Sequence, residues 1–148
     1  MISKRVKAKD LSNSTITAKV SILIAAHNEE LVIESKIKSI LSSNYPKESI
    51  EIFIGTDKCT DKTDEIIQRL SESNRSIKHV KFSERSGKIK IINSLTEDAN
   101  GDVLILTDAN VLFTENTINA LLKHFNDPKV GLVDSNMKNF GMNSSGIS

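Results

Sequence analysis

The stretch Gly101-Asp102-Val103-Leu104-Ile105-Leu106-Thr107-Asp108-Ala109-Asn110 contains four consecutive apolar residues, Val103 to Leu106, followed by a polar segment. A short continuous apolar run of this kind is typical of a strand that is buried on both faces. Strands buried on both faces occur in parallel sheets that are covered by helices. We therefore predict that this stretch forms an inner strand of an α/β sheet.

Asp108 and Asn110 follow this strand, with one residue between them. Alternate side chains of an extended chain point to the same side, so the two are expected to converge. Ligands of open α/β sheets bind in the crevice beyond the carboxyl ends of the strands. Two converging oxygen ligands there can hold a divalent cation, which can in turn hold a diphosphate. The alternative is that Asp108 only forms a turn, since Asp and Asn are common turn residues.

The length of 148 residues allows one domain with a substantial core. Twenty basic and nineteen acidic residues nearly balance, which gives no support for a nucleic-acid partner. Five basic residues and only one acidic residue, Asp10, lie in 1–19, and we expect this basic leader to be flexible. The lone Cys59 fits a reducing compartment, and no apolar run reaches the ~20 residues of a membrane helix. We therefore expect a cytoplasmic location.

Strand and helix patterns alternate along the rest of the chain. The predicted strands, including the one above, are 20–26, 50–55, 77–82, 103–106 and 130–134. Helical apolar stripes lie between them, and they contain Ile33, Ile37, Ile40 and Leu41 in a first helix from about 29 to 43, Ile66, Ile67 and Leu70 in a second, Ile91, Ile92, Leu95 and Ala99 in a third, and Ile118, Leu121, Leu122 and Phe125 in a fourth.

This alternation predicts a mostly parallel sheet of about five strands with helices on both faces. The predicted α/β domain covers 20–137, after the leader 1–19 and before a Ser/Gly/Asn-rich tail, 138–148, that we expect to be disordered. Three strands are followed by loops with carboxylates, at Glu29, Asp57 and Asp108. In a parallel sheet these ends lie along one edge, so we expect the three loops to form one site.

Common phosphate-binding signatures are missing. No Gly-x-Gly-x-x-Gly follows the first strand, which disfavours a dinucleotide fold. Gly87-Lys88 lacks the earlier glycine of a P-loop and is followed by Ile89 instead of Ser or Thr. Binding of a phosphate group would therefore depend on a cation at Asp108 and Asn110, on Lys88, or on helix amino termini.

Four segments in order resemble one known family. They are Val-Ser-Ile-Leu-Ile-Ala-Ala-His-Asn-Glu-Glu at 20–30, Thr-Asp-Lys-Cys-Thr-Asp-Lys-Thr at 56–63, Ser-Gly-Lys at 86–88 and Thr-Asp-Ala-Asn at 107–110. Together they resemble the amino-terminal, nucleotide-binding half of a family-two glycosyltransferase with the Rossmann-like GT-A fold. The resemblance covers about 20–137 and implies a UDP-sugar or similar donor, an Mg²⁺ or Mn²⁺ ion, and inverting transfer to an acceptor hydroxyl.

The resemblance also implies roles for single residues. Ala25, Ala26 and Glu29 would line the nucleoside pocket, Asp57 would accept a hydrogen bond from the uracil ring, and Lys88 would lie near the nucleotide. Asp108 and Asn110 would form the metal motif, with Asp108 also contacting the bound cofactor.

Two departures from the family pattern concern single positions. Thr56 stands where the family usually has the first carboxylate of an Asp-Asp pair, which leaves the nucleobase open. Asn110 replaces the second carboxylate of the metal motif, and a neutral carboxamide is a weaker ligand for a hard cation.

The family places its general base and acceptor site after the metal motif, and the sequence assigns no catalytic residue there. We therefore expect this chain to be an inactive piece of a longer enzyme, whose acceptor would be a saccharide or a lipid-linked group at the cytoplasmic face of the membrane. The alternatives are a non-catalytic nucleotide-binding or interaction domain and a nucleotidyltransferase. We also expect an uncovered sheet edge to allow self-association.

Overall fold

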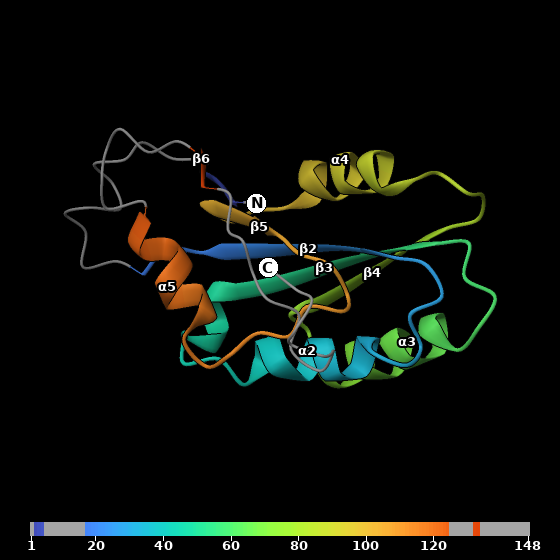
Figure 1. Cartoon of the computed structure of the whole chain (residues 1–148), viewed down its shortest axis with the longest axis horizontal. Helices are drawn as coiled ribbons and strands as arrows, with labels where there is room; N and C mark the ends of the chain where they lie inside the picture. The colour runs from blue at the N-terminus through green and yellow to red at the C-terminus, as the bar shows by residue number, and fades with distance from the viewer. Residues whose placement is uncertain (1, 5–16, 125–131, 134–148) are drawn as a thin grey trace, which may run out of the picture.

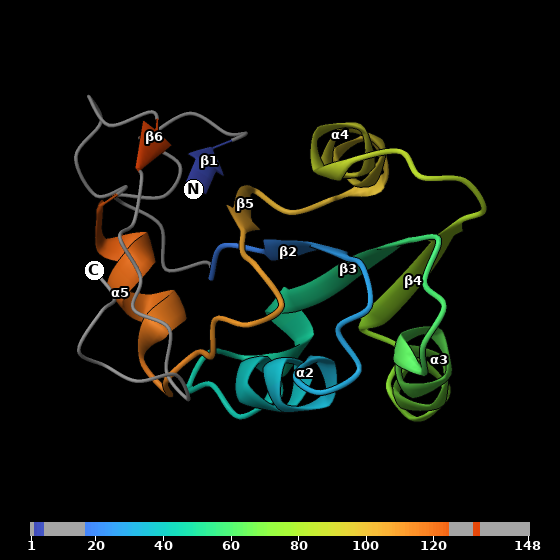
Figure 2. The ribbon, with the colours of Figure 1, turned by 45° about the vertical axis from the view of Figure 1, so that its right-hand side comes forward.

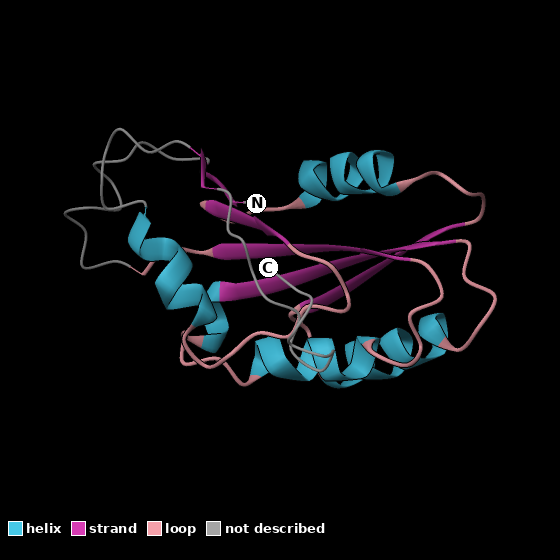
Figure 3. Cartoon of the chain, viewed as in Figure 1, coloured by secondary structure: helices cyan, strands magenta, loops and turns pink. Residues whose placement is uncertain are grey.

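The computed structural model describes residues 2–4, 17–124 and 132–133. A sheet forms the middle layer, with helices on both sides (Figures 1 and 2). Figure 3 shows the same arrangement by secondary structure. In chain order the elements are β1 (Ile2–Lys4), β2 (Val20–Ala26), α2 (Ile33–Leu41), a 3-10 turn η1 (Lys47–Ser49), β3 (Ile50–Asp57), α3 (Thr63–Ser73), β4 (Ile77–Phe82), α4 (Lys88–Asp98), β5 (Val103–Leu106), α5 (Thr117–Lys123) and β6 (Leu132–Val133).

Within the described residues the sheet has six strands in the order β4-β3-β2-β5-β1-β6. The pairs β2–β3, β2–β5 and β3–β4 are parallel, whereas β1 pairs antiparallel with both β5 and β6. The predicted α/β class is therefore confirmed, with four parallel strands instead of about five. The described part of the fifth predicted strand, Leu132–Val133, pairs with the unpredicted strand β1.

Alternate residues of the central strand β2 enter two apolar clusters on opposite faces of the sheet. Ile22 and Ile24 pack on the face covered by α2 and α3, and Leu23 packs on the face covered by α4. All three side chains have no exposed surface. Burial of this kind stabilises the fold by about 1.5–3 kcal/mol for each large aliphatic side chain.

Helix α2 begins at Ile33, four residues later than predicted. A turn precedes the helix, in which Val32 and Ile33 donate their backbone N–H groups to the carbonyl oxygen of Glu29. The backbone N–H groups at the start of this turn bind another loop. Glu29 donates its backbone N–H to Thr63 Oγ1 at 2.8 Å, and Glu30 donates its own to Asp61 Oδ2 at 3.2 Å. These partners are more than thirty positions away, so the local pattern does not indicate them.

The domain boundaries 1–19, 20–137 and 138–148 remain predictions. Residues 2–4 of the predicted flexible leader form β1, while 5–16 and 134–148 lie outside the described residues. Within the described part of the chain, β4 borders one side of the sheet and β6 the other. Self-association through an edge strand also remains a prediction.

Gly55 in β3 is required by close packing of α4 on the sheet. A methyl group at this position would lie 2.3 Å from Cγ2 of Ile91 and 3.3 Å from Cε2 of Phe82. We predict that Gly55→Ala lowers the free energy of unfolding by about 1–3 kcal/mol, measured by urea denaturation, because the core has no room for the added atom.

A double-mutant cycle with Ile91→Ala tests this cause. Because Ile91→Ala removes the clashing atom, the two changes together should destabilise by less than the sum of the separate effects. Simple additivity would contradict the packing explanation.

Candidate functional site

The parallel strands β2, β3 and β5 end at one border of the sheet, which we call the carboxyl edge. A cavity of about 150 Å³ lies there. It contains four of the residues predicted to bind the nucleotide, and its lining is Ala25, Ala26, His27, Asp57, Arg85, Gly87, Lys88 and Ile91. Glu29 and Asp108 are not among the lining residues, and the roles of all the predicted residues remain predictions.

Asp57, the last residue of β3, holds the start of α4 against the sheet. Its Oδ1 accepts the backbone N–H of Ser86 at 2.7 Å, and its Oδ2 accepts that of Gly87 at 3.1 Å. These N–H groups, chiefly that of Ser86, together with the nearby charge of Arg85 hold the pKa of Asp57 below its usual value. Gly87, at φ 85°, gives the loop the turn that most side chains disfavour.

The loop after β2 is bound to the loop after β3. His27 Nδ1 lies 2.6 Å from the carbonyl oxygen of Asp57, and Asn28 Oδ1 accepts the backbone N–H of Thr60 at 2.8 Å. Asn28 and Lys58 both adopt positive φ, at 50° and 49°. Such backbone conformations are retained only where surrounding contacts fix them, so the geometry of this side of the cavity is set by the fold.

Lys88 connects the cavity to Asp108. Its Nζ lies 2.5 Å from Asp108 Oδ1, and both side chains are more than half exposed. Exposed ion pairs of this kind contribute only about 0–1 kcal/mol, so a ligand can separate them at little cost. The charge of Asp108 also affects Glu29. The pKa of Glu29 is raised, mainly by burial and then by repulsion from the Asp108 carboxylate.

The metal motif presents two side chains with oxygen ligands. Asp108 and Asn110 are both exposed on the loop after β5, and no cluster of three His, Cys, Asp or Glu side chains suited to a metal occurs in the described residues. Mg²⁺ is commonly bound by one or two carboxylates, with phosphate oxygens and water completing its shell. The donor set therefore fits a cation that binds together with a diphosphate, and not one held by the protein alone.

Lys36 is a residue of this edge that the sequence analysis missed. It is fully buried in α2, and its Nζ donates to Thr107 Oγ1 at 2.7 Å and to the carbonyl oxygen of Val111. Burial lowers the pKa of Lys36 to about 7, against the opposing effect of Asp108. The available signal was its position on the apolar face of α2, three residues after Ile33 and four before Ile40.

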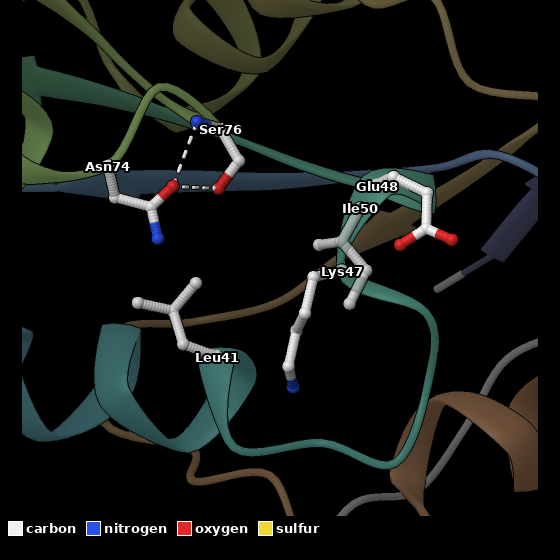
Figure 4. A pocket seen from close by; sticks show the side chains of 6 residues that line it. All are labelled: Leu41, Lys47, Glu48, Ile50, Asn74 and Ser76. Carbon is white, nitrogen blue, oxygen red and sulfur yellow. Dashed lines mark hydrogen bonds between the residues drawn. The ribbon is translucent and has the colours of Figure 1, made fainter.

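A second cavity of about 430 Å³ lies near the start of β3, at the opposite end of that strand from Asp57 (Figure 4). Its lining is Leu41, Lys47, Glu48, Ile50, Asn74 and Ser76. Three of the polar side chains there have local partners: Asn74 Oδ1 accepts from the backbone and hydroxyl of Ser76, and Lys47 donates to the carbonyl of Ser43. We therefore place the candidate site at the carboxyl edge.

The model of the family "Glycosyl transferase family 2" matches residues 21–147. The chain belongs to this family. The family match confirms the resemblance found in the four sequence segments.

Two bacterial relatives of this family-2 chain are similar over most of its length. The probable glycosyltransferase YdaM of Bacillus subtilis (strain 168) is 37% identical over 119 residues, which is 78% of this chain. The poly-beta-1,6-N-acetyl-D-glucosamine synthase of Staphylococcus aureus (strain COL) is 30% identical over 118 residues, or 79% of this chain. The matched part is 28% of the length of each relative.

Solved structures of glycosyltransferases share the fold. A mannosyltransferase of Pyrobaculum calidifontis, in complex with GDP-Man and Mn²⁺, has a TM-score of 0.69 at 24% identity and covers 88% of this family-2 chain and 39% of its own. S. aureus TarS 1–349 in complex with UDP-GlcNAc has a TM-score of 0.66 at 22% identity. This match covers 74% of the present chain and 31% of the TarS chain. Within the described part of this chain, every helix is too short or too polar to cross a membrane.

We predict that Asp57 stabilises the fold in a pH-dependent way. Because the folded-state pKa of Asp57 is lowered, its stabilisation is full above the unfolded pKa of about 3.9 and is lost as the pH falls through the folded value. Asp57→Asn should therefore lower the free energy of unfolding at pH 7, and the difference from the unmodified chain should shrink below pH 4.

Urea denaturation at several pH values measures this difference. Glu84→Gln is the matched control, because Glu84 is an exposed carboxylate on the loop to which Asp57 is hydrogen-bonded. An Asp57→Asn effect that is the same at pH 7 and pH 3 would contradict the proposed electrostatic origin.

Proposed function

We propose that this chain is the donor-binding domain of a metal-dependent, inverting glycosyltransferase that takes a nucleotide-diphospho-sugar, with a UDP-sugar as the expected donor. The observation that carries the proposal is the cavity at the carboxyl edge, one of whose lining residues, Lys88, forms an ion pair with Asp108. A nucleoside pocket and a cation site for its diphosphate would then lie side by side.

The cavity suits a planar base. Ala25 and Ala26 leave space at the end of β2, and the carboxylate of Asp57 lies beside them. A carboxylate has about four acceptor positions, and two are used by the N–H groups of Ser86 and Gly87. The remaining positions can accept the imide N–H of uracil.

The identity of the base is part of the proposal. A carboxylate at position 57 can accept the N–H groups of guanine as well as that of uracil. Thr56 does not contribute, because it is buried and its hydroxyl lies 3.0 Å from Nε2 of His79. The related folds carry either nucleotide, UDP-GlcNAc in TarS and GDP-Man in the mannosyltransferase.

The charges at Lys88 and Asp108 support binding of a diphosphate. A divalent cation on Asp108 and Asn110 would supply charge that offsets the negative charge developing on the leaving diphosphate. Binding of that cation would release Lys88 from Asp108, which leaves its ammonium free to bind a phosphate oxygen. The bound Mn²⁺ of the mannosyltransferase complex supports a divalent cation here.

Transfer itself is proposed for a longer protein that contains this domain. Deprotonation of the acceptor hydroxyl requires a positioned base, and we assign none in this chain. The similarity to a poly-beta-1,6-N-acetyl-D-glucosamine synthase supports a saccharide or a lipid-linked group as its acceptor. We propose that this longer protein acts at the cytoplasmic face of a membrane.

We predict that the chain binds UDP more tightly with Mn²⁺ than without it, measured by calorimetry alongside GDP and CDP. Asp108→Asn should reduce the affinity in Mn²⁺ by about tenfold or more, because it removes the anionic ligand. It should not reduce the metal-free affinity, because it also releases Lys88 from its carboxylate partner.

Asp98→Asn is the control for Asp108→Asn, since it makes the same charge change at an exposed position at the far end of α4. Failure of the unmodified chain to bind any of the three diphosphates in Mn²⁺ would refute the proposed function.

The neutral ligand at position 110 gives a second prediction. Asn110→Asp should increase the Mn²⁺ affinity of the chain in the presence of UDP, because a carboxylate binds a hard cation better than a carboxamide does. A manganese titration measures the gain, with the exposed Asn93→Asp in α4 as the control. No gain in affinity would count against Asn110 as a ligand.

A further inference from the structure

The buried amine of Lys36 is the most unusual feature of the core. Its side chain has no exposed surface, although it lies in the apolar face of α2 among Ile33, Ile37 and Ile40. Removal of an ammonium or amine from water costs several kcal/mol unless its hydrogen bonds are replaced. The contacts that replace them therefore indicate what the residue does.

These contacts all lie in residues 107–113, which we call the Asp108 segment. Nζ donates to Thr107 Oγ1 at 2.7 Å and to the carbonyl of Val111, and it lies 4.2 Å from the ring centroid of Phe113. The first two partners flank Asp108 and Asn110 on both sides. One amine thus connects the beginning and the end of the proposed metal motif.

Other hydrogen bonds fix the same segment. Ser39, one turn after Lys36 on α2, accepts the backbone N–H of Phe113 on its Oγ at 3.1 Å. The N–H of Thr107 donates to the carbonyl of Leu23 in β2 at 3.1 Å, and that of Val111 donates to the carbonyl of Asp108 at 3.2 Å. Helix α2 and strand β2 therefore hold the two ends, while the side chains of Asp108 and Asn110 remain exposed.

We infer that Lys36 is a positioning residue, which holds the Asp108 segment in the conformation that presents Asp108 and Asn110 to the cation. The inference rests on the proposed function, because it assigns that conformation a purpose. Only one of the two ligands in this motif is a carboxylate, so the cation site depends on geometry more strongly than a site with two carboxylates would.

Lys36→Met tests the inference because Met keeps an unbranched apolar chain and removes the donors. Lys38→Met is the matched control, since Lys38 lies on the same helix with its side chain 64% exposed. In amide hydrogen exchange without ligand, Lys36→Met should increase exchange at Val111 and Phe113 by about tenfold, while β2 and β3 stay protected. Lys38→Met should leave all of these amides unchanged.

Binding of UDP separates positioning from general stability. Lys36→Met should reduce the gain in UDP affinity that Mn²⁺ provides by about tenfold, while metal-free UDP affinity stays within about twofold. Equal losses with and without Mn²⁺ would show a merely structural role and overturn the inference. Thr107→Val removes only one acceptor, so it should give the same pattern with a smaller effect if Lys36→Met does not fold.

The two proposals fail separately. Absence of nucleotide binding by the unmodified chain refutes the proposed function, and the exchange of Val111 and Phe113 then still decides whether Lys36 holds the segment. If the exchange rates of both amides are unchanged in Lys36→Met and in Thr107→Val, the inference is overturned, whatever the chain binds.

Discussion

Parallel pairing of β2 with β3 and with β5 is the constraint on which the site depends. The register pairs Ala26 with Thr56 and Leu23 with Leu106. The residue after the first pair is Asp57, and the residue after the second pair begins the segment with Asp108. Because parallel strands end on the same side, groups that are fifty positions apart in sequence reach one edge without any direct attraction between them.

The same contacts that hold the fold together also shape the cavity. Asp57 accepts two N–H groups at the start of α4, where the helix dipole favours a negative charge. This interaction places Gly87 and Lys88 beside the end of β2. A residue whose expected role is to bind the base is thus also a fixed part of the link between the sheet and a helix.

The sequence predicted the features that depend on local periodicity. The apolar runs at 20–26, 50–55, 77–82 and 103–106 are strands. The described residues of the helical stripes pack against the sheet as expected, and Phe125 of the fourth stripe lies outside the described residues. A parallel sheet then follows from the alternation of strands and helices, so the shared edge of Glu29, Asp57 and Asp108 was predictable as well.

Features that depend on distant partners were not predictable in this way. Strand β1 has three residues and gains its order from pairing with β5, about a hundred positions away. The turn that precedes α2 is bound through two N–H groups to the loop after β3. The sequence analysis did not single out Lys36, because its oxygen partners lie about seventy positions further along the chain.

The carboxylates at the carboxyl edge differ in the partners that bind their negative charge, and Asp108 differs from its neighbours in this respect. Asp57 is bound by backbone N–H groups, and Asp61 accepts both the backbone N–H and the hydroxyl of Thr63. These partners belong to the folded backbone or to adjacent residues and cannot move away without local unfolding. The recorded partner of Asp108 is Lys88, whose long exposed side chain can rotate into water. Of these carboxylates, Asp108 can therefore exchange its protein partner for a cation at the lowest cost, whereas Asp57 retains its backbone partners when a ligand arrives.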